Sequence, residues 1–191
     1  MWIGPSKCDE QRSVREKDIE RIWNELASTR GFRETYLLFA PAIDLFREAL
    51  SCYQNGAYMA TVLMCRACIE TSVYLLTTRR RIKWREDLEM VREVKVDYDL
   101  IRAKWKCILW RAKSDGYIND ELEQELREIR ESGNFVAHYG QRFDKEIVRK
   151  IKDRRAGEIK GWIKRGDSLR TLHRTANVLK VLMGKTLTNA T

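Results

Sequence analysis

The spacing of apolar positions predicts helices along most of the chain. Apolar residues recur three and four positions apart, as on a helix with one buried face. Strand signals are absent almost throughout, and residues 1–12 are expected to form a loose arm. The predicted helices cover approximately residues 13–28, 41–54, 57–77, 98–112, 119–138, 143–157 and 167–184, with loop and one helical piece at 79–96 and a short piece at 159–163. The pattern therefore predicts an all-α fold.

The stretch 57–77 differs from the other predicted helices because it is apolar on nearly every side. A helix without a polar face is normally the central one of a bundle. It carries only two charged residues, Arg66 and Glu70, which are four positions apart and can pair on one helix face. Burying them would be costly unless both are paired or serve a neighbouring group.

The stretch 126–140 contains three polar residues at four-residue steps: Arg130, Asn134 and His138. On a helix they lie one above the other, while apolar residues mark the opposite side. His138 is one of only two histidines in the chain. A polar stripe at the edge of a core is a place where side chains acquire shifted protonation behaviour. These three residues are therefore the first candidates for a functional site.

The composition favours a single cytoplasmic domain without a cofactor. The chain has 191 residues, of which 43% are hydrophobic, enough for one substantial core. No membrane span is expected, because no run of about 18 apolar residues occurs, and the N-terminus lacks the pattern of a secretory signal. Five cysteines, an odd number, favour free thiols in a reducing compartment. The pair Cys65 and Cys68 lacks further ligands for zinc, so no metal is predicted.

The net charge of +9 is concentrated behind His138. Residues 1–139 contain 23 Lys and Arg against 23 Asp and Glu, whereas residues 140–191 contain 14 against 5. Such a surplus is typical of a polyanion-binding surface, and equally of a solvated basic helix face. The candidate nucleic-acid contacts are Arg79, Arg80, Arg81, Arg149, Lys150, Lys152, Arg154 and Arg155. For the three consecutive arginines, a basic helix end that complements the helix dipole is the alternative.

Three sequence segments together resemble a known family. They are Gly56-Ala-Tyr-Met-Ala60, Arg66-Ala-Cys-Ile-Glu70 and Arg130-Glu-Ser-Gly-Asn-Phe-Val-Ala-His138. The set is similar to the HEPN-like domain of unknown function found in prokaryotic restriction and defence gene neighbourhoods. The resemblance implies a HEPN-like core at 37–140, preceded by an arm and helix at 1–36 and followed by a basic extension of additional C-terminal helices at 141–191, all within one domain.

The HEPN resemblance also implies an activity and a role for individual residues. Members of the superfamily form homodimeric helical bundles, and some act as metal-independent endoribonucleases through an arginine and a histidine. By that resemblance His138 would be the general acid or base and Asn134 a positioning group, while Arg130 would contact the phosphate. Glu70 and Arg66 would hold the imidazole in place. Here the arginine precedes the histidine by eight positions, more than the five to seven of the nuclease motif.

Three functions fit these observations. The first is an RNA-associated protein that acts as a ribonuclease of a defence or toxin-type system. The second is a non-catalytic, dimeric interaction or sensor module that binds a defence-system protein or nucleic acid. The third is a structural helical dimer without a nucleic-acid role, in which Arg66, Glu70, Asn134 and His138 form a polar network that fixes helix packing.

Overall fold

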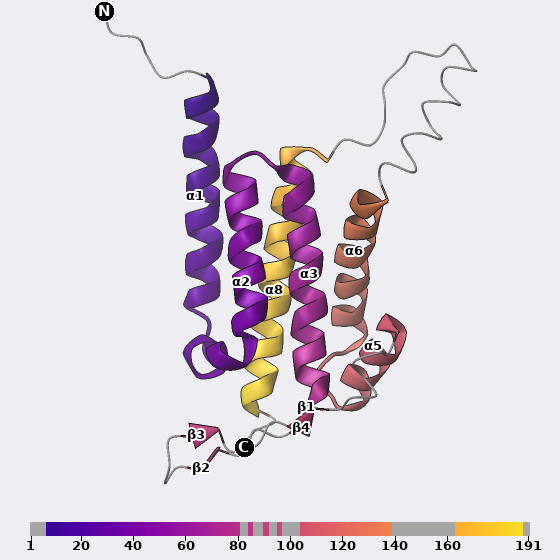
Figure 1. Cartoon of the computed structure of the whole chain (residues 1–191). Helices are drawn as coiled ribbons and strands as arrows, with labels where there is room; N and C mark the ends of the chain where they lie inside the picture. Colours follow the sequence, from indigo (N-terminus) through magenta and orange to yellow (C-terminus); the bar gives the residue numbers. More distant parts are fainter. Residues whose placement is uncertain are drawn as a thin grey trace, which may run out of the picture.

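The computed structural model describes residues 7–80, 84–85, 90–91, 95–96, 104–138 and 163–188. Its helices pack side by side as a bundle, so the fold is all-α (Figure 1). The helices in this part of the chain are α1 (Lys7–Ala27), α2 (Phe32–Gln54), α3 (Tyr58–Thr78), α5 (Trp105–Ser114), α6 (Asp120–Ala137) and α8 (Arg165–Thr188).

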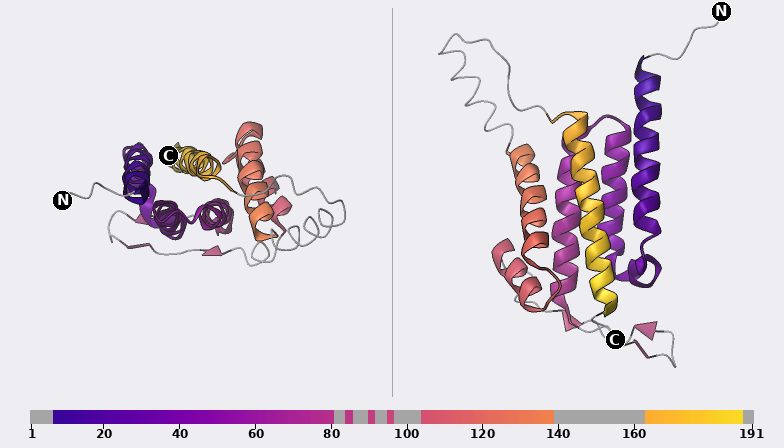
Figure 2. Two further views of the ribbon diagram at one scale, coloured as in Figure 1. Left: turned by 90° about the horizontal axis from the view of Figure 1, so that it is seen from above. Right: turned by 180° about the vertical axis from the view of Figure 1, so that it is seen from behind.

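The bundle has two layers, with a further pair of helices at one side. Viewed from above, α2 and α3 form one layer and α1 and α8 the other (Figure 2). Helix α6 stands beside α3 and α8, and the short α5 packs against α3 near the start of α6. Helix α3 contacts α2, α5, α6 and α8, which confirms that the most apolar helix is central.

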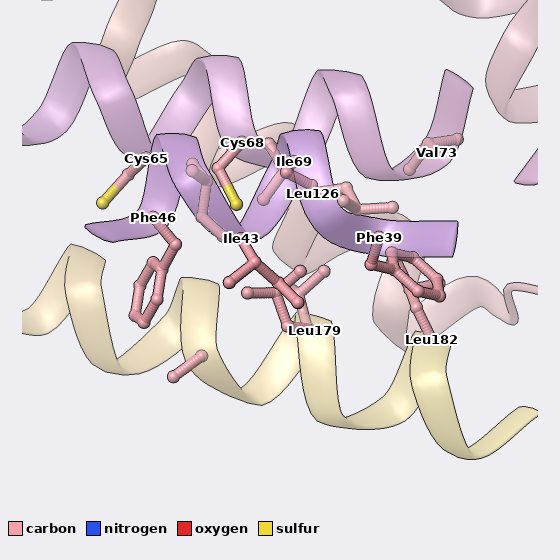
Figure 3. Packing of buried hydrophobic residues seen from close by; sticks show 14 of the residues in the cluster. Phe39, Ile43, Phe46, Cys65, Cys68, Ile69, Val73, Leu126, Leu179 and Leu182 are labelled. Carbon is pink, nitrogen blue, oxygen red and sulfur yellow. The ribbon is translucent and has the colours of Figure 1, made fainter. Parts of the chain in front are cut away.

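The core joins all of these helices in one hydrophobic cluster. Ile43 of α2 faces Leu179 of α8, and Phe39 of α2 lies beside Leu182, with α3 and α6 closing the space from the other side (Figure 3). By length and composition alone, α3 is also the one helix among the described residues that could cross a membrane. Half of that apolar window is buried inside the bundle, and a core helix of a soluble protein passes the same test.

Several helix boundaries differ from those predicted. Helix α1 begins at Lys7, inside the expected arm, and α2 begins at Phe32, so Pro41 lies in mid-helix instead of in the first turn. The missing hydrogen bond at Pro41 is tolerable because Pro41 is exposed and Leu37, one turn earlier, is 71% exposed, which leaves the freed carbonyl open to water. Gly31 precedes α2 with φ 92°, a left-handed conformation suited to glycine.

The segment after α3 contains short strands where loop and one helical piece were expected. These are β1 (Arg79–Arg80), β2 (Trp84–Arg85), β3 (Met90–Val91) and β4 (Lys95–Val96). Strand β1 pairs antiparallel with β4, and β2 pairs antiparallel with β3, so one pair is nested inside the other. Each strand has two residues and leaves the all-α class unchanged.

The C-terminal half of the bundle follows the prediction in outline. Of the two residues that the sequence offers as the cap of α6, Asn119 and Asp120, it is Asn119 that accepts a hydrogen bond from the Leu122 backbone, at 3.0 Å. Helix α8 is longer than expected, and α5 begins at Trp105. The helix predicted at 143–157 and the piece starting at 159 lie outside the described residues, apart from residue 163.

Candidate functional site

The two charges of α3 pair with each other, as their spacing predicted. Arg66 Nε donates to Glu70 Oε1 at 3.1 Å, and the side chains are 23% and 32% exposed. The pair therefore lies at the edge of the core. The four-residue spacing along a regular helix is sufficient to bring the groups together.

The third member of this cluster is Arg130 of α6. Its Nε donates to the same oxygen, Glu70 Oε1, at 2.8 Å, and its guanidinium carbon lies 5.6 Å from the ring centroid of Trp105 in α5. One carboxylate thus receives hydrogen bonds from two helices, and the Arg130 cation also lies over an aromatic face. The cluster joins α3, α5 and α6.

Gly133 allows α6 to approach α3 at this level. A Cβ atom at Gly133 would lie 2.6 Å from Cβ and 2.5 Å from Cδ of Arg66. Both distances are far shorter than a van der Waals contact, so the aliphatic stem of Arg66 occupies the space that a side chain at residue 133 would need. Sequence reasoning missed this role. The available signal was a glycine within an otherwise continuous helical pattern, three residues after Arg130.

His138 and Asn134 lie outside the Arg66–Glu70–Arg130 cluster. His138 is the residue at the C-terminal end of α6, where its backbone N–H donates to the Asn134 carbonyl at 3.0 Å. The His138 side chain is exposed and that of Asn134 is half-buried. Within the described ranges, neither side chain forms a hydrogen bond with Glu70, whose partners are both arginines.

The expectation that Glu70 and Arg66 hold the imidazole is therefore not what the structure shows. Arg130 occupies that place on Glu70. The reason is distance along the helix: eight residues separate Arg130 from His138, which corresponds to about 12 Å of α-helix. Glu70 meets α6 at the level of Arg130, two turns before the imidazole.

The predicted basic contacts fall almost entirely outside the described part of the chain. Arg79 and Arg80 form β1, which follows directly on α3. The other six predicted contacts lie outside the described residues: Arg81, Arg149, Lys150, Lys152, Arg154 and Arg155.

A second polar cluster joins α1, α2 and α8. The Tyr53 hydroxyl donates to Asp18 Oδ2 at 2.9 Å, while Arg165 donates to Asp18 Oδ2 at 2.7 Å and to the Tyr53 oxygen at 3.0 Å. Nearby, Arg21 Nη2 lies 3.2 Å from Nε2 of His173 and 4.0 Å from Asp18. Sequence reasoning did not find this cluster, because its members are far apart in the chain and none belongs to a recognisable motif.

The environment of this cluster shifts the pKa values of its side chains. Burial alone would raise the pKa of Asp18, but the hydrogen bonds from Arg165 and Tyr53 outweigh it and hold this pKa below its usual value. Burial raises the pKa of Tyr53. The hydrogen bond to Asp18 raises the pKa of Arg165 still further above neutrality. All three groups therefore keep one protonation state across the neutral range.

Two of the cysteines, Cys65 and Cys68, have the character of core residues. Cys65 and Cys68 are buried in α3, and burial raises the pKa of Cys65 to about 12 and that of Cys68 well above its usual value. Such thiols are poor nucleophiles and poor metal ligands at neutral pH. Across the described ranges, no three His, Cys, Asp or Glu residues are grouped closely enough to hold a metal ion.

No family model, curated protein or solved structure gives a significant match to this chain. The functional proposal therefore rests on the geometry of the two polar clusters and on the exposed His138.

Proposed function

We propose that this protein is an RNA-associated, HEPN-like helical protein that works in the cytoplasm as a homodimer. The observation that carries the proposal is the position of His138. Its exposed imidazole lies at the C-terminal end of α6. Cations and carboxylates are equal in number in residues 1–139, whereas residues 140–191 contain 14 cations and 5 carboxylates. A polar side chain at the start of such a segment is well placed to meet a phosphodiester backbone.

In this proposal the Arg66–Glu70–Arg130 cluster is structural. It fixes α6 against α3 and so determines where Asn134 and His138 emerge at the end of the helix. Arg130 donates to Glu70 and lies about 12 Å from His138 along the helix. Because Arg130 is held by Glu70, the proposal does not use Arg130 as the phosphate partner of His138.

Metal-independent RNA cleavage is the second candidate function, and the exposed imidazole favours it. His138 would move the proton of the ribose 2′-hydroxyl, and Asn134, one turn earlier, would position the substrate. The phosphate charge would be met by arginine from the basic segment or from a second copy of the chain. A defence or toxin-type role, or binding of a defence-system protein, follows only from the family resemblance.

The RNA proposal is tested by measuring RNA affinity of the full chain against salt concentration. Neutralisation of phosphates makes affinity fall linearly on a double-logarithmic plot, with a slope of about −0.7 for each contacted phosphate of a single strand. We expect a slope of about −3 or steeper, because several cations would act together. Affinity that is absent, or that does not change with salt, would contradict the proposal and favour a purely structural helical dimer.

Cleavage is tested separately, with EDTA present. The chain has two histidines, so His173→Ala is a matched control for His138→Ala. His173 contacts Arg21 between α8 and α1, away from the end of α6. If the cleavage candidate is correct, the wild type and His173→Ala cleave RNA and His138→Ala does not. Equal cleavage by all three proteins would assign the activity to a contaminant.

A further inference from the structure

Helix α5 presents an exposed tryptophan. Its inner face carries Ile108, Leu109 and Ala112, which are 8%, 2% and 0% exposed, whereas Trp110 on the outer face is 69% exposed. Tryptophan has the largest apolar surface of any side chain and is rarely left this open. Trp105, at the start of the same helix, instead packs under Arg130 on the α6 side.

The outer face of α5 also carries a lysine close to Trp110. Residues 104–114 contain four Lys and Arg and no carboxylate. Arg111 is neutralised by Asp115 at 2.8 Å, and Lys113 by Asp120 and Glu123. In the described part of the chain, Lys106 forms no ion pair, and it lies one turn before Trp110 on the same face.

We propose that this face of α5 binds single-stranded RNA, with the Trp110 indole stacked on a base and the Lys106 ammonium against a neighbouring phosphate. The inference rests on the proposed RNA association and adds a second contact surface to it. Stacking on an exposed aromatic side chain requires an unpaired base, while a cation beside it binds the phosphate backbone of the same strand. Duplex RNA keeps its bases stacked internally and would not use Trp110.

The surroundings of Trp110 favour a nucleic acid over a second copy of the chain. The helix neighbours of Trp110 are Lys106, Cys107, Lys113 and Ser114, of which three are charged or polar. The centre of a protein interface is depleted in lysine. An indole beside Lys106, whose charge no carboxylate of the described residues neutralises, is instead suited to a ligand with flat apolar faces and negative charge.

The test for stacking measures the affinity of the full chain for a fluorescein-labelled, unstructured RNA by anisotropy. Trp110→Ala is expected to weaken binding by about fivefold or more, and Trp110→Phe by much less, because a phenyl ring still stacks. Leu37→Ala, at another exposed apolar residue on α2, is the matched control and should bind as the wild type does. A blunt-ended RNA duplex should bind Trp110→Ala and wild type equally.

The test for the phosphate contact compares Lys106→Ala with Lys17→Ala, which removes an exposed lysine of α1. Loss of one phosphate contact lowers the magnitude of the salt slope by about 0.7 for a single strand. Lys106→Ala should show this change and Lys17→Ala should not. Identical slopes for both variants would overturn the role of Lys106.

Failure of this inference is distinguishable from failure of the proposed function. If the wild type binds RNA in a salt-dependent manner and Trp110→Ala binds it equally well, the α5 surface is wrong and the RNA association stands. If the wild type does not bind RNA, both are wrong. If Trp110→Ala changes the mass measured by light scattering without RNA, a second copy covers this face and the inference is overturned.

Discussion

Gly133 sets how closely α6 can approach α3. The hydrogen bond between Arg130 and Glu70 at 2.8 Å requires the two helices to be close at this level, and the stem of Arg66 fills the gap. Glycine in a helix interior costs up to about 1 kcal/mol relative to alanine. In this protein the cost is offset by the contact between the helices.

We predict that Gly133→Ala lowers the free energy of unfolding by about 1 to 3 kcal/mol, despite the better helix propensity of alanine. The new Cβ would lie 2.6 Å from Cβ of Arg66, an atom that is fixed to the α3 backbone and cannot rotate away. The helices must therefore separate. Urea denaturation with an unchanged m-value would measure the loss.

Gly184→Ala is the matched control. Gly184 also lies within a helix, α8, but apart from its chain neighbours and the backbone of its own helix nothing lies within 4 Å of the position of its Cβ. Alanine there should be neutral or should stabilise the fold by about 0.5 to 1 kcal/mol through helix propensity. If both variants unfolded at the same urea concentration, close packing at Gly133 would not be the reason for glycine.

At the scale of elements, the sequence predicted the helices α3 and α6 well, but not which side chains join them. Helical spacing identified the Arg66–Glu70 pair and the stripe of Arg130, Asn134 and His138. It could not show which member of the stripe faces Glu70, because that depends on the relative height of two helices. The expected partner was His138, and the observed one is Arg130.

We predict that Glu70→Gln lowers the free energy of unfolding by about 1 kcal/mol, or about 2 to 4 °C in Tm for a chain of this size. The amide keeps the shape but loses the charge that two guanidinium groups share. The effect stays small because the side chains are 23% to 32% exposed and partly screened by water. Glu20→Gln, at an exposed position of α1, is the control and should change stability little.

The double-mutant cycle of Glu70→Gln and Arg130→Gln isolates the contact between the helices. We expect a coupling free energy of about 0.5 to 1 kcal/mol. Arg130→Gln should also leave RNA affinity nearly unchanged if Arg130 is structural. A large loss of RNA affinity at unchanged Tm would instead make Arg130 a phosphate contact.

At the scale of the whole molecule, the long-range contacts are the part that the sequence did not predict. Asp18 and Arg165 are 147 positions apart, and their pairing with Tyr53 ties α1 and α2 to the start of α8. Periodicity indicates which face of each helix is buried, and it carries no information on which polar groups meet across the bundle. The mid-helix position of Pro41 and the start of α1 at Lys7 were also not predicted, because tertiary packing overrides local sequence signals.

The Asp18–Tyr53–Arg165 cluster makes the stability of the fold depend on pH in the acid range. Because the pKa of folded Asp18 is lowered, the unfolded chain binds its proton first as the pH falls. The stabilisation is therefore fully present above the unfolded pKa of about 3.9 and is lost as pH falls through the lower, folded value. Stability should decline as the medium is acidified below about pH 5.

Asp18→Asn should remove this part of the pH dependence. At pH 7 we expect the variant to be less stable by about 2 kcal/mol, because a carboxylate at 16% exposure loses charge-assisted hydrogen bonds with Arg165 and Tyr53. The difference from wild type should shrink as the pH falls through the lowered pKa of folded Asp18, because the wild-type carboxyl then also becomes neutral. Asp44→Asn, at a carboxylate that is 69% exposed, is the control and should follow the wild-type curve. A difference between Asp18→Asn and wild type that is constant from pH 7 to pH 2 would show that Asp18 contributes through shape and packing and not through its charge.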